Sequence, residues 1–193
     1  MSAFRLCVDL NVWIGAFIAD AQGKTGTASQ SVVRAIQDGR AALGPLQLAI
    51  SHAMLSRLHQ VMTRHGVSLD EASRLVSLIH ALALVGPAAE PPHLVLGGGV
   101  LPTRDARMRE RDPYDATAAS APLDIEDGRV VDVAVAGRAD ALVTWNFADF
   151  THGSDTVVIA GRVHVRETAA HRLTIIRTPE MAAWLRSGER PRP

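Results

Sequence analysis

Acidic and amide side chains follow short apolar runs at two distant places in this chain. The first run ends at Asp9, with Asn11 two residues later, and the second run, 141–144, is followed by Asn146 and Asp149. Carboxylate and amide oxygens are hard ligands of the kind that Mg²⁺ and Mn²⁺ prefer. If the two runs are parallel strands of one sheet, their carboxyl ends bring these groups to the same edge.

A third acidic segment precedes the second apolar run. Asp124, Glu126 and Asp127 stand at the start of a helical pattern that leads into it. Clustered carboxylates raise one another's pKa unless a cation lies between them, and a divalent ion there would activate water for phosphodiester cleavage. Each residue also has a plainer explanation, as a strand-end cap, a turn residue or an acid at a helix N-terminus. Spacing alone leaves both interpretations open.

The elements that would position these residues alternate along the chain. Strands are expected at residues 4–8, 46–50, 93–96, 141–144, 156–159 and 173–176. Helices are expected at residues 11–19, 29–38, 52–65, 68–84 and 127–137, and from Thr178 onward. Ser51 is a good helix N-cap, and Ser68 with Glu71 forms a capping-box pattern. Alternating strands and helices predict an α/β domain whose central, mainly parallel sheet is flanked by helices.

Composition sets broad limits on the class of protein. The chain has 193 residues, 47% hydrophobic content and no formal net charge, which predicts one packed domain over 1–193 without a strongly basic coat. A single cysteine, Cys7, excludes an internal disulfide, fits a reducing compartment and is expected to pack rather than react. No signal segment and no apolar stretch of about 18 residues is found, so we expect a cytoplasmic protein without a membrane segment. Residues 97–122, rich in Gly and Pro, are expected to form a loop or insertion.

Four segments together resemble the PIN-domain family, which includes metal-dependent ribonucleases and VapC-type toxins. They are VDLNVWIGA (8–16), AISHAMLSRLHQVM (49–62), DIEDGRVVDVAVAGRADALVTWNFADF (124–150) and RLTIIRTPEMAAWL (172–185). The resemblance implies a three-layer fold and an Mg²⁺ or Mn²⁺-dependent endoribonuclease acting on single-stranded RNA. It also implies the toxin half of a toxin–antitoxin pair, with a cognate antitoxin as partner, and a homodimer.

The family's residue roles can be carried over to matching positions. The resemblance makes Asp9 and Asp127 direct metal ligands, and it puts Asn146 in the place of the family's last acid. Thr144 matches a small hydroxyl residue on that strand, and Asn11 matches the Asn that helps to hold the first acid. In the implied mechanism, the metal lowers the pKa of a bound water that attacks phosphorus, so no covalent intermediate is needed.

Two departures weaken the match to an efficient nuclease. Arg57 stands where the family usually has Glu, and a guanidinium there would repel a metal but could bind phosphate. With Asn146 also neutral, only two of the usual four carboxylates remain, unless Asp124, Glu126 or Asp149 substitutes. A second hypothesis is therefore a catalytically degenerate PIN-fold module that binds RNA or a protein partner. A third, a nucleotide-binding α/β domain, is disfavoured because no Gly-rich phosphate loop is present.

Two further points stay open at this stage. The segment 111–121 (RDPYDATAASA) also resembles the acidic start of the penultimate helix, which would make Asp112 and Asp115 the site acids. The separation along the sequence favours Asp127. It precedes Thr144 by 17 residues, which suits one helix and a turn, whereas Asp115 precedes Thr144 by 29 residues and would leave extra chain to place. Trp145 could stack on a base or could pack at the rim of the core.

Overall fold

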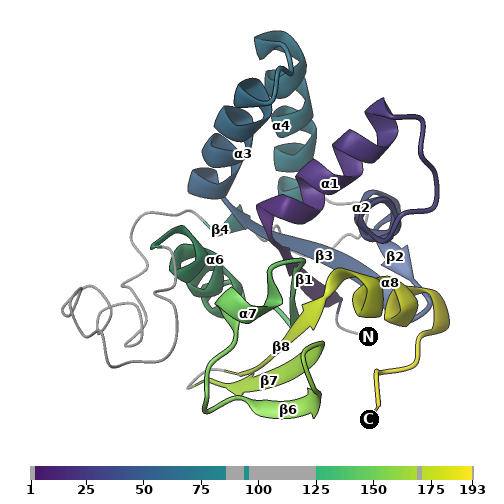
Figure 1. Ribbon diagram of the computed structural model, residues 1–193, viewed down its shortest axis with the longest axis vertical. Coiled ribbons are helices and arrows are strands. Elements are labelled where there is room, and N and C mark those ends of the chain that lie inside the picture. Colours follow the sequence, from purple (N-terminus) through teal and green to yellow (C-terminus); the bar gives the residue numbers. More distant parts are fainter. Residues whose placement is uncertain (1–2, 86–93, 96–124, 169–170, 193) are drawn as a thin grey trace.

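The computed structural model describes residues 3–85, 94–95, 125–168 and 171–192, and at 94–95 and 125–129 it describes the backbone alone (Figure 1). The chain forms a mixed sheet flanked by helices. The strands are β1 (Phe4–Val8), β2 (Arg40–Ala41), β3 (Gly44–Ser51), β4 (Leu94–Val95), β5 (Ala141–Thr144), β6 (Thr156–Ile159), β7 (Val163–Glu167) and β8 (Arg172–Arg177).

The parallel centre of the sheet fixes where the site lies. The strand order is β2-β3-β1-β5-β8-β7-β6, with β4 beside β3. Strands β3, β1, β5 and β8 are parallel neighbours, whereas β2, β6 and β7 pair antiparallel at the two margins. Leu6 of β1 is in register with Leu48 of β3 and with Ala141 of β5. The carboxyl ends of β1 and β5 therefore meet at one edge.

The second half of β1 is apolar because both faces of the sheet are covered there. Leu6, Cys7 and Val8 are all fully buried. Side chains alternate along a strand, so Cys7 faces one layer while Leu6 and Val8 face the other. The Cys7 thiol lies 3.8 Å from the carbonyl oxygen of Val130, which identifies its layer as helix α6. A strand buried in this way carries a continuous apolar run, as this sequence does.

Helices form the layers on either side (Figure 1). Their bounds are α1 (Leu10–Ala21), α2 (Ala28–Asp38), α3 (His52–Arg64), α4 (Leu69–Leu84), α6 (Ile125–Ala136), α7 (Phe147–Phe150) and α8 (Thr178–Ser187). Helices α1, α2 and α8 pack together, with α1 on β5, α8 on β5 and β8, and α2 on β2 and β3. Helix α6 packs on β1, β3 and β5. Helices α3 and α4 form a hairpin that projects beyond the sheet in Figure 1.

Capping residues explain why helices begin directly after strands. The carboxylate of Asp9 accepts a hydrogen bond from the Leu10 backbone N–H at 2.7 Å, so the residue that ends β1 also caps α1. The hydroxyl of Ser51 accepts from the Met54 backbone N–H at 3.2 Å and caps α3 at the end of β3. In both places one residue links a strand directly to the helix that follows it.

The predicted α/β class and mainly parallel sheet are confirmed. The expected strands at 4–8, 141–144 and 156–159 have the predicted bounds, and the helix expected at 11–19 extends over Leu10–Ala21. Strands β2 and β7 and helix α7 were not predicted, and the loop expected at 97–122 lies outside the described residues. No helix within the described residues has the length and apolar content needed to span a membrane.

Candidate metal site at the carboxyl edge of the sheet

Asp9 lies at the centre of this edge, between the ends of two parallel strands. Its backbone N–H donates to the carbonyl oxygen of Val143 at 2.9 Å, which ties the end of β1 to β5. Only 6% of the residue is exposed. A carboxylate this deeply buried is unusual and requires polar partners to stay ionised.

Thr144 and Asn11 provide those partners. The hydroxyl of Thr144, itself fully buried, donates to Asp9 Oδ2 at 2.7 Å. The same hydroxyl accepts from the Asn146 backbone N–H at 2.9 Å and from Asn11 Nδ2 at 3.3 Å. Asn11 Oδ1 in turn accepts from the Trp145 backbone N–H at 3.2 Å. The predicted supporting residues Asn11 and Thr144 thus join β1, α1 and β5 around one carboxylate.

Burial dominates the electrostatics of Asp9. Loss of solvent raises the pKa of its carboxyl above the ordinary value, and the negative charge of Asp149 raises it further. Hydrogen bonds from Thr144, the Leu10 N–H and Asn11 act in the opposite direction and lower the pKa. Among the described residues, no cationic side chain forms an ion pair with Asp9. The site therefore holds a buried acid and a second acid close by, with no described counter-charge.

Asn146 and Asp149 complete the described part of the site. Asn146 is exposed at the start of α7, and its side-chain amide donates to Asp149 Oδ2. The Asn146 backbone N–H donates to the Thr144 hydroxyl, which itself binds Asp9, so this hydrogen bond holds the β5–α7 turn next to the Asp9 carboxylate. Of the predicted residues, the structure thus brings together Asp9, Asn11, Thr144, Asn146 and Asp149.

Asp127 lies in the first turn of α6, and its side chain is outside the described part. The backbone still locates it. Val130, three residues later, is level with Cys7, and α6 ends near the start of β5, so α6 runs antiparallel to the strands. Its first turn therefore points toward the edge that holds Asp9. Also outside the described part are Asp112, Asp115, Asp124 and the side chain of Glu126.

A complete ligand set cannot be formed from the described side chains alone. Among them, no group of three or more His, Cys, Asp or Glu residues is arranged to hold a metal ion.

Arg57 is partly buried on α3 and engaged in an interaction of its own. Cys7 is fully buried, and burial together with nearby Asp9 raises the pKa of its thiol, which leaves it unfit as a nucleophile.

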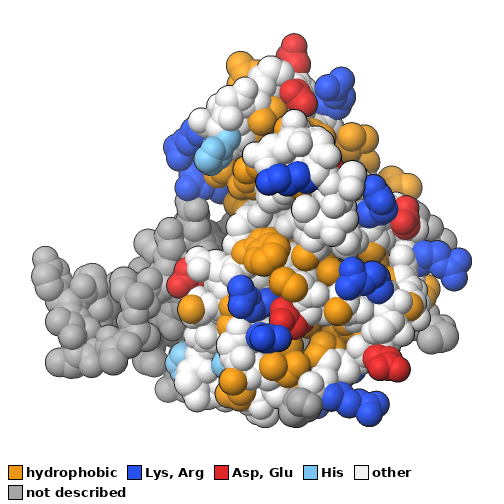
Figure 2. Space-filling model, turned by 45° about the vertical axis from the view of Figure 1, so that its right-hand side comes forward, with side chains coloured by type: hydrophobic (Ala, Val, Ile, Leu, Met, Phe, Trp, Pro, Cys, Tyr) orange, Lys and Arg blue, Asp and Glu red, His pale blue; other side chains and the backbone are white. Residues whose placement is uncertain are grey.

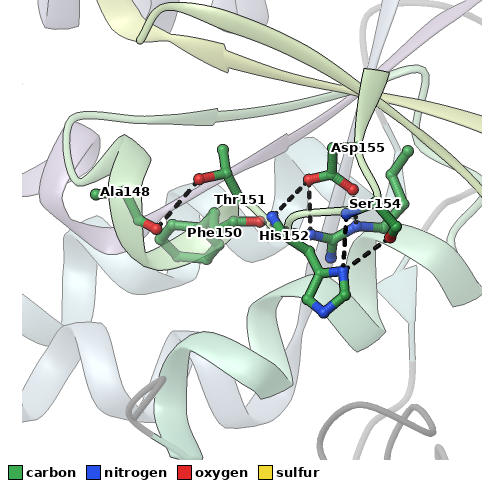
Figure 3. Close-up of polar contacts among 7 residues, drawn as sticks. Ala148, Phe150, Thr151, His152, Ser154 and Asp155 are labelled. Atoms are coloured by element: carbon green, nitrogen blue, oxygen red, sulfur yellow. Dashed lines mark hydrogen bonds and ion pairs between the residues drawn. The ribbon is translucent and has the colours of Figure 1, made fainter. Parts of the chain in front are cut away.

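A second polar cluster, which was not predicted from the sequence, lies beside α7 (Figure 3). The guanidinium of Arg166 binds both oxygens of Asp155, at 2.8 and 2.9 Å, and donates to the carbonyl oxygen of Phe150 at 2.9 Å. Asp155 also accepts from the His152 backbone N–H at 2.8 Å. This cluster holds the chain that leaves α7, and Arg166 was not recognised because β7 was not predicted. Asp132, a buried acid in the apolar run of α6, was also missed.

A separate hollow of about 420 Å³ lies between α2, β2 and α8. Its lining includes Arg34, Arg40, Arg186 and Asp38, and it contains no residue of the predicted site. Figure 2 shows positive and negative side chains interspersed over one face of the molecule, and neither sign covers that face alone. The surface in that view thus matches the neutral composition.

Comparison with known proteins gives one family match. The family model described as PIN domain matches residues 5–148, about three quarters of the chain, from β1 into α7. All the described residues of the candidate site except Asp149 fall inside this match, and Asp149 follows it directly. Neither a search of curated proteins nor a search of solved structures found a match.

Proposed function

Because this chain belongs to the PIN-domain family, whose members are typically nucleases, we propose that it is an Mg²⁺ or Mn²⁺-dependent endoribonuclease acting on single-stranded RNA. One observation carries the proposal. Asp9 is buried next to the negative charge of Asp149 without a described cationic partner. Such an arrangement is costly on its own and becomes favourable when a divalent cation is shared between the two acids.

The donor set fits a hard divalent cation. Asp9 and Asp127 are the proposed direct ligands, and Asn146 or Asp149 is proposed to act through water. Asp9 uses one lone pair on each oxygen for Leu10 and Thr144, which leaves further lone pairs for a ligand bond. The direction of α6 supports the inclusion of Asp127, because its first turn faces the same edge. All these donors are oxygens, the type that Mg²⁺ and Mn²⁺ prefer.

When bound, the cation would supply charge neutralisation and an activated water for attack on phosphorus. The chain's own residues do the positioning. Thr144 and the Leu10 N–H hold the Asp9 carboxylate in one orientation, so little reorganisation accompanies binding. Asn146 orients Asp149 through its side-chain amide. No protein nucleophile is needed, and the only cysteine of the chain is buried beneath the site.

The direct test is cleavage of a single-stranded RNA with Mn²⁺ by wild type and Asp9→Asn. We expect the variant to lose activity by roughly a hundred-fold or more, because one direct ligand loses its charge. Asp140→Asn is the matched control. Asp140 lies at the opposite end of β5, where its carboxylate accepts from the Arg5 backbone N–H at 2.8 Å. Equal activity in wild type and Asp9→Asn would reject the proposal.

The biological role that we propose is a cytoplasmic toxin that a cognate antitoxin inhibits, in a homodimeric protein. The support for this role is the resemblance of residues 172–185 to the final strand and helix of longer PIN-domain toxins. Expression of wild type should arrest growth of a host cell, and expression of Asp9→Asn should not. Growth arrest by both proteins would show that the toxicity is unrelated to the site.

The second candidate is a degenerate PIN-fold module that binds RNA or a protein partner without cleavage. Its support is the neutral Asn146 and the cationic Arg57 at two positions where the family usually has acids. Calorimetric titration with Mn²⁺ of wild type and Arg57→Glu separates the candidates. A degenerate module binds metal only in the variant, whereas an active nuclease already binds it as wild type and cleaves RNA.

A further inference from the structure

Trp145 is the most exposed of the Trp and Phe rings that the structure describes. It is 39% exposed, whereas Trp13 and Trp184 are 1% and 6% exposed. It stands between Thr144 and Asn146, two residues of the candidate site. The exposed part of its ring is therefore open to contact with a ligand at these residues.

The ring is held in a fixed position by its polar edge. The indole N–H donates to Ser29 Oγ at 2.8 Å, and Ser29 on α2 is only 3% exposed. The backbone N–H of Trp145 donates to Asn11 Oδ1 at 3.2 Å, which ties the same residue to the support of Asp9. The polar group of the indole is therefore satisfied inside the protein, while part of its carbon surface remains in water.

Gly15 on α1 makes room for this hydrogen bond. A Cβ at Gly15 would lie 2.9 Å from Ser29 Oγ and 3.8 Å from Trp145 Nε1, and the first distance is too short for an ordinary contact. Helices α1 and α2 thus approach closely because residue 15 has no side chain. Two helices and the β5–α7 turn together hold one partly exposed ring beside the site.

We infer that Trp145 stacks on an unpaired base of the RNA next to the phosphate that the proposed metal site would bind. This inference rests on the proposed function and adds a residue that contacts a base of its substrate. Stacking on an aromatic ring suits single strands, because a base within a duplex has both faces covered. The formal net charge of the chain is zero, and stacking adds affinity that does not depend on overall charge.

Tryptophan fluorescence tests this inference directly. The full chain is mixed rapidly with Mn²⁺ and a ten-nucleotide single-stranded RNA, or the same RNA as a duplex, and the fluorescence is recorded before cleavage proceeds. The single strand should quench the exposed Trp145, and the duplex should not. Trp184→Phe, which alters a buried ring, should retain the quenching, and Trp145→Phe should abolish it.

Affinity provides the second readout. Trp145→Ala should weaken binding of the single strand by roughly ten-fold or more, and Trp145→Phe should weaken it less because a stacking face remains. An RNA series with one abasic position at a time should show a comparable loss in wild type at one position. If Trp145→Ala does not fold, the quenching and the abasic series still decide the matter.

Failure of this inference can be told apart from failure of the proposed function. If Asp9→Asn abolishes cleavage but Trp145→Ala binds and cleaves as wild type, the stacking role is wrong and the nuclease stands. If single-stranded RNA quenches Trp145 but cleavage does not depend on Asp9, stacking stands and the nuclease chemistry is wrong. Absence of quenching by the single strand overturns the inference outright.

Discussion

Thr144 and Asp9 are 135 residues apart in sequence, and a 2.7 Å hydrogen bond joins Thr144 Oγ1 to Asp9 Oδ2. Both residues are buried, at the ends of adjacent parallel strands. The bond can form only when β1 and β5 are in the observed register. The central sheet and the candidate site are therefore parts of one arrangement, and a change at Thr144 should affect both.

Substitution of Thr144 tests this link. Thr144→Val keeps the shape but removes the donor, so the Asp9 carboxylate loses a buried hydrogen bond at a cost of about 1–3 kcal/mol in unfolding free energy. Cleavage of RNA should fall by roughly ten-fold or more, and Mn²⁺ should bind more weakly. Thr144→Ser keeps the hydroxyl and should retain most of the activity. Equal activity of the Val and Ser variants would contradict a role for this bond in holding Asp9.

The raised pKa of Asp9 predicts a pH dependence in metal-free protein. Since burial raises the pKa of the folded state above the ordinary 3.8, the folded protein binds the proton more tightly than the unfolded chain does. Stability should therefore decline as pH rises from 3.8 through the folded pKa, and the loss should be complete above it. Asn does not ionise, so Asp9→Asn should not lose stability in this pH range. The variant should therefore have a higher Tm than wild type at neutral pH in EDTA.

Metal binding should reverse this order. Mn²⁺ requires the ionised carboxylate, so its affinity for wild type should fall as pH decreases through the raised pKa. Added Mn²⁺ should raise the Tm of wild type more than that of Asp9→Asn. Thermal melts across pH, with EDTA or Mn²⁺, measure both effects. A wild type more stable than Asp9→Asn at neutral pH in EDTA would show that Asp9 has a favourable partner when metal is absent.

The packing of Gly15 against Ser29 predicts a compensating pair of substitutions. Gly15→Ala adds a methyl group 2.9 Å from Ser29 Oγ, which should displace the hydroxyl from the Trp145 indole. We expect the variant to lose stability despite the better helix propensity of Ala, which is worth about 1 kcal/mol. Ser29→Ala should remove the clash and restore stability in the double variant. Denaturation of wild type, the two single variants and the double variant gives the coupling free energy between residues 15 and 29. Purely additive changes in unfolding free energy would contradict the proposed contact.

The ion pair of Arg166 and Asp155 predicts a large loss of stability from a single change. The Asp155 side chain is fully buried, and that of Arg166 is 16% exposed. Arg166→Met leaves the Asp155 charge unpaired and should cost about 3–5 kcal/mol, measured by urea denaturation. Because Arg166 also binds Phe150, the neighbouring Asp149 should become less ordered. Arg172→Met is the control, since its pair with Glu167 is exposed on both sides and should contribute little.

Much of the fold could be predicted because its signals are local. The apolar runs of β1 and β5 are continuous, and caps such as Ser51 and Ser68 mark where helices begin. Strand β7 was missed although VHVRE alternates apolar and polar residues, and Val163 and Val165 are buried as that alternation predicts. The segment is only five residues long, and its place in the sheet depends on pairing with β8.

Part of the site could also be predicted from local signals in the sequence. An acid directly after a buried strand predicts the position of Asp9, and the order of the strands brings Thr144, Asn146 and Asp149 to it. The support of Trp145 by Ser29 and Gly15 could not be predicted, because it depends on how closely α1 and α2 approach. Asp132 has a signal in hindsight, since an acid within the apolar run VVDVAVA is rarely accidental.

The central claim is that Asp9 and Asp127 share one divalent cation at the carboxyl edge of the sheet. The most direct measurement is diffraction from crystals grown with Mn²⁺, at a wavelength where manganese scatters anomalously. We predict a single strong anomalous peak in direct coordination distance of a carboxylate oxygen from each residue, and no peak there in Asp9→Asn crystals. Side chains of Asp9 and Asp127 that point apart, with manganese elsewhere or absent, would contradict the account.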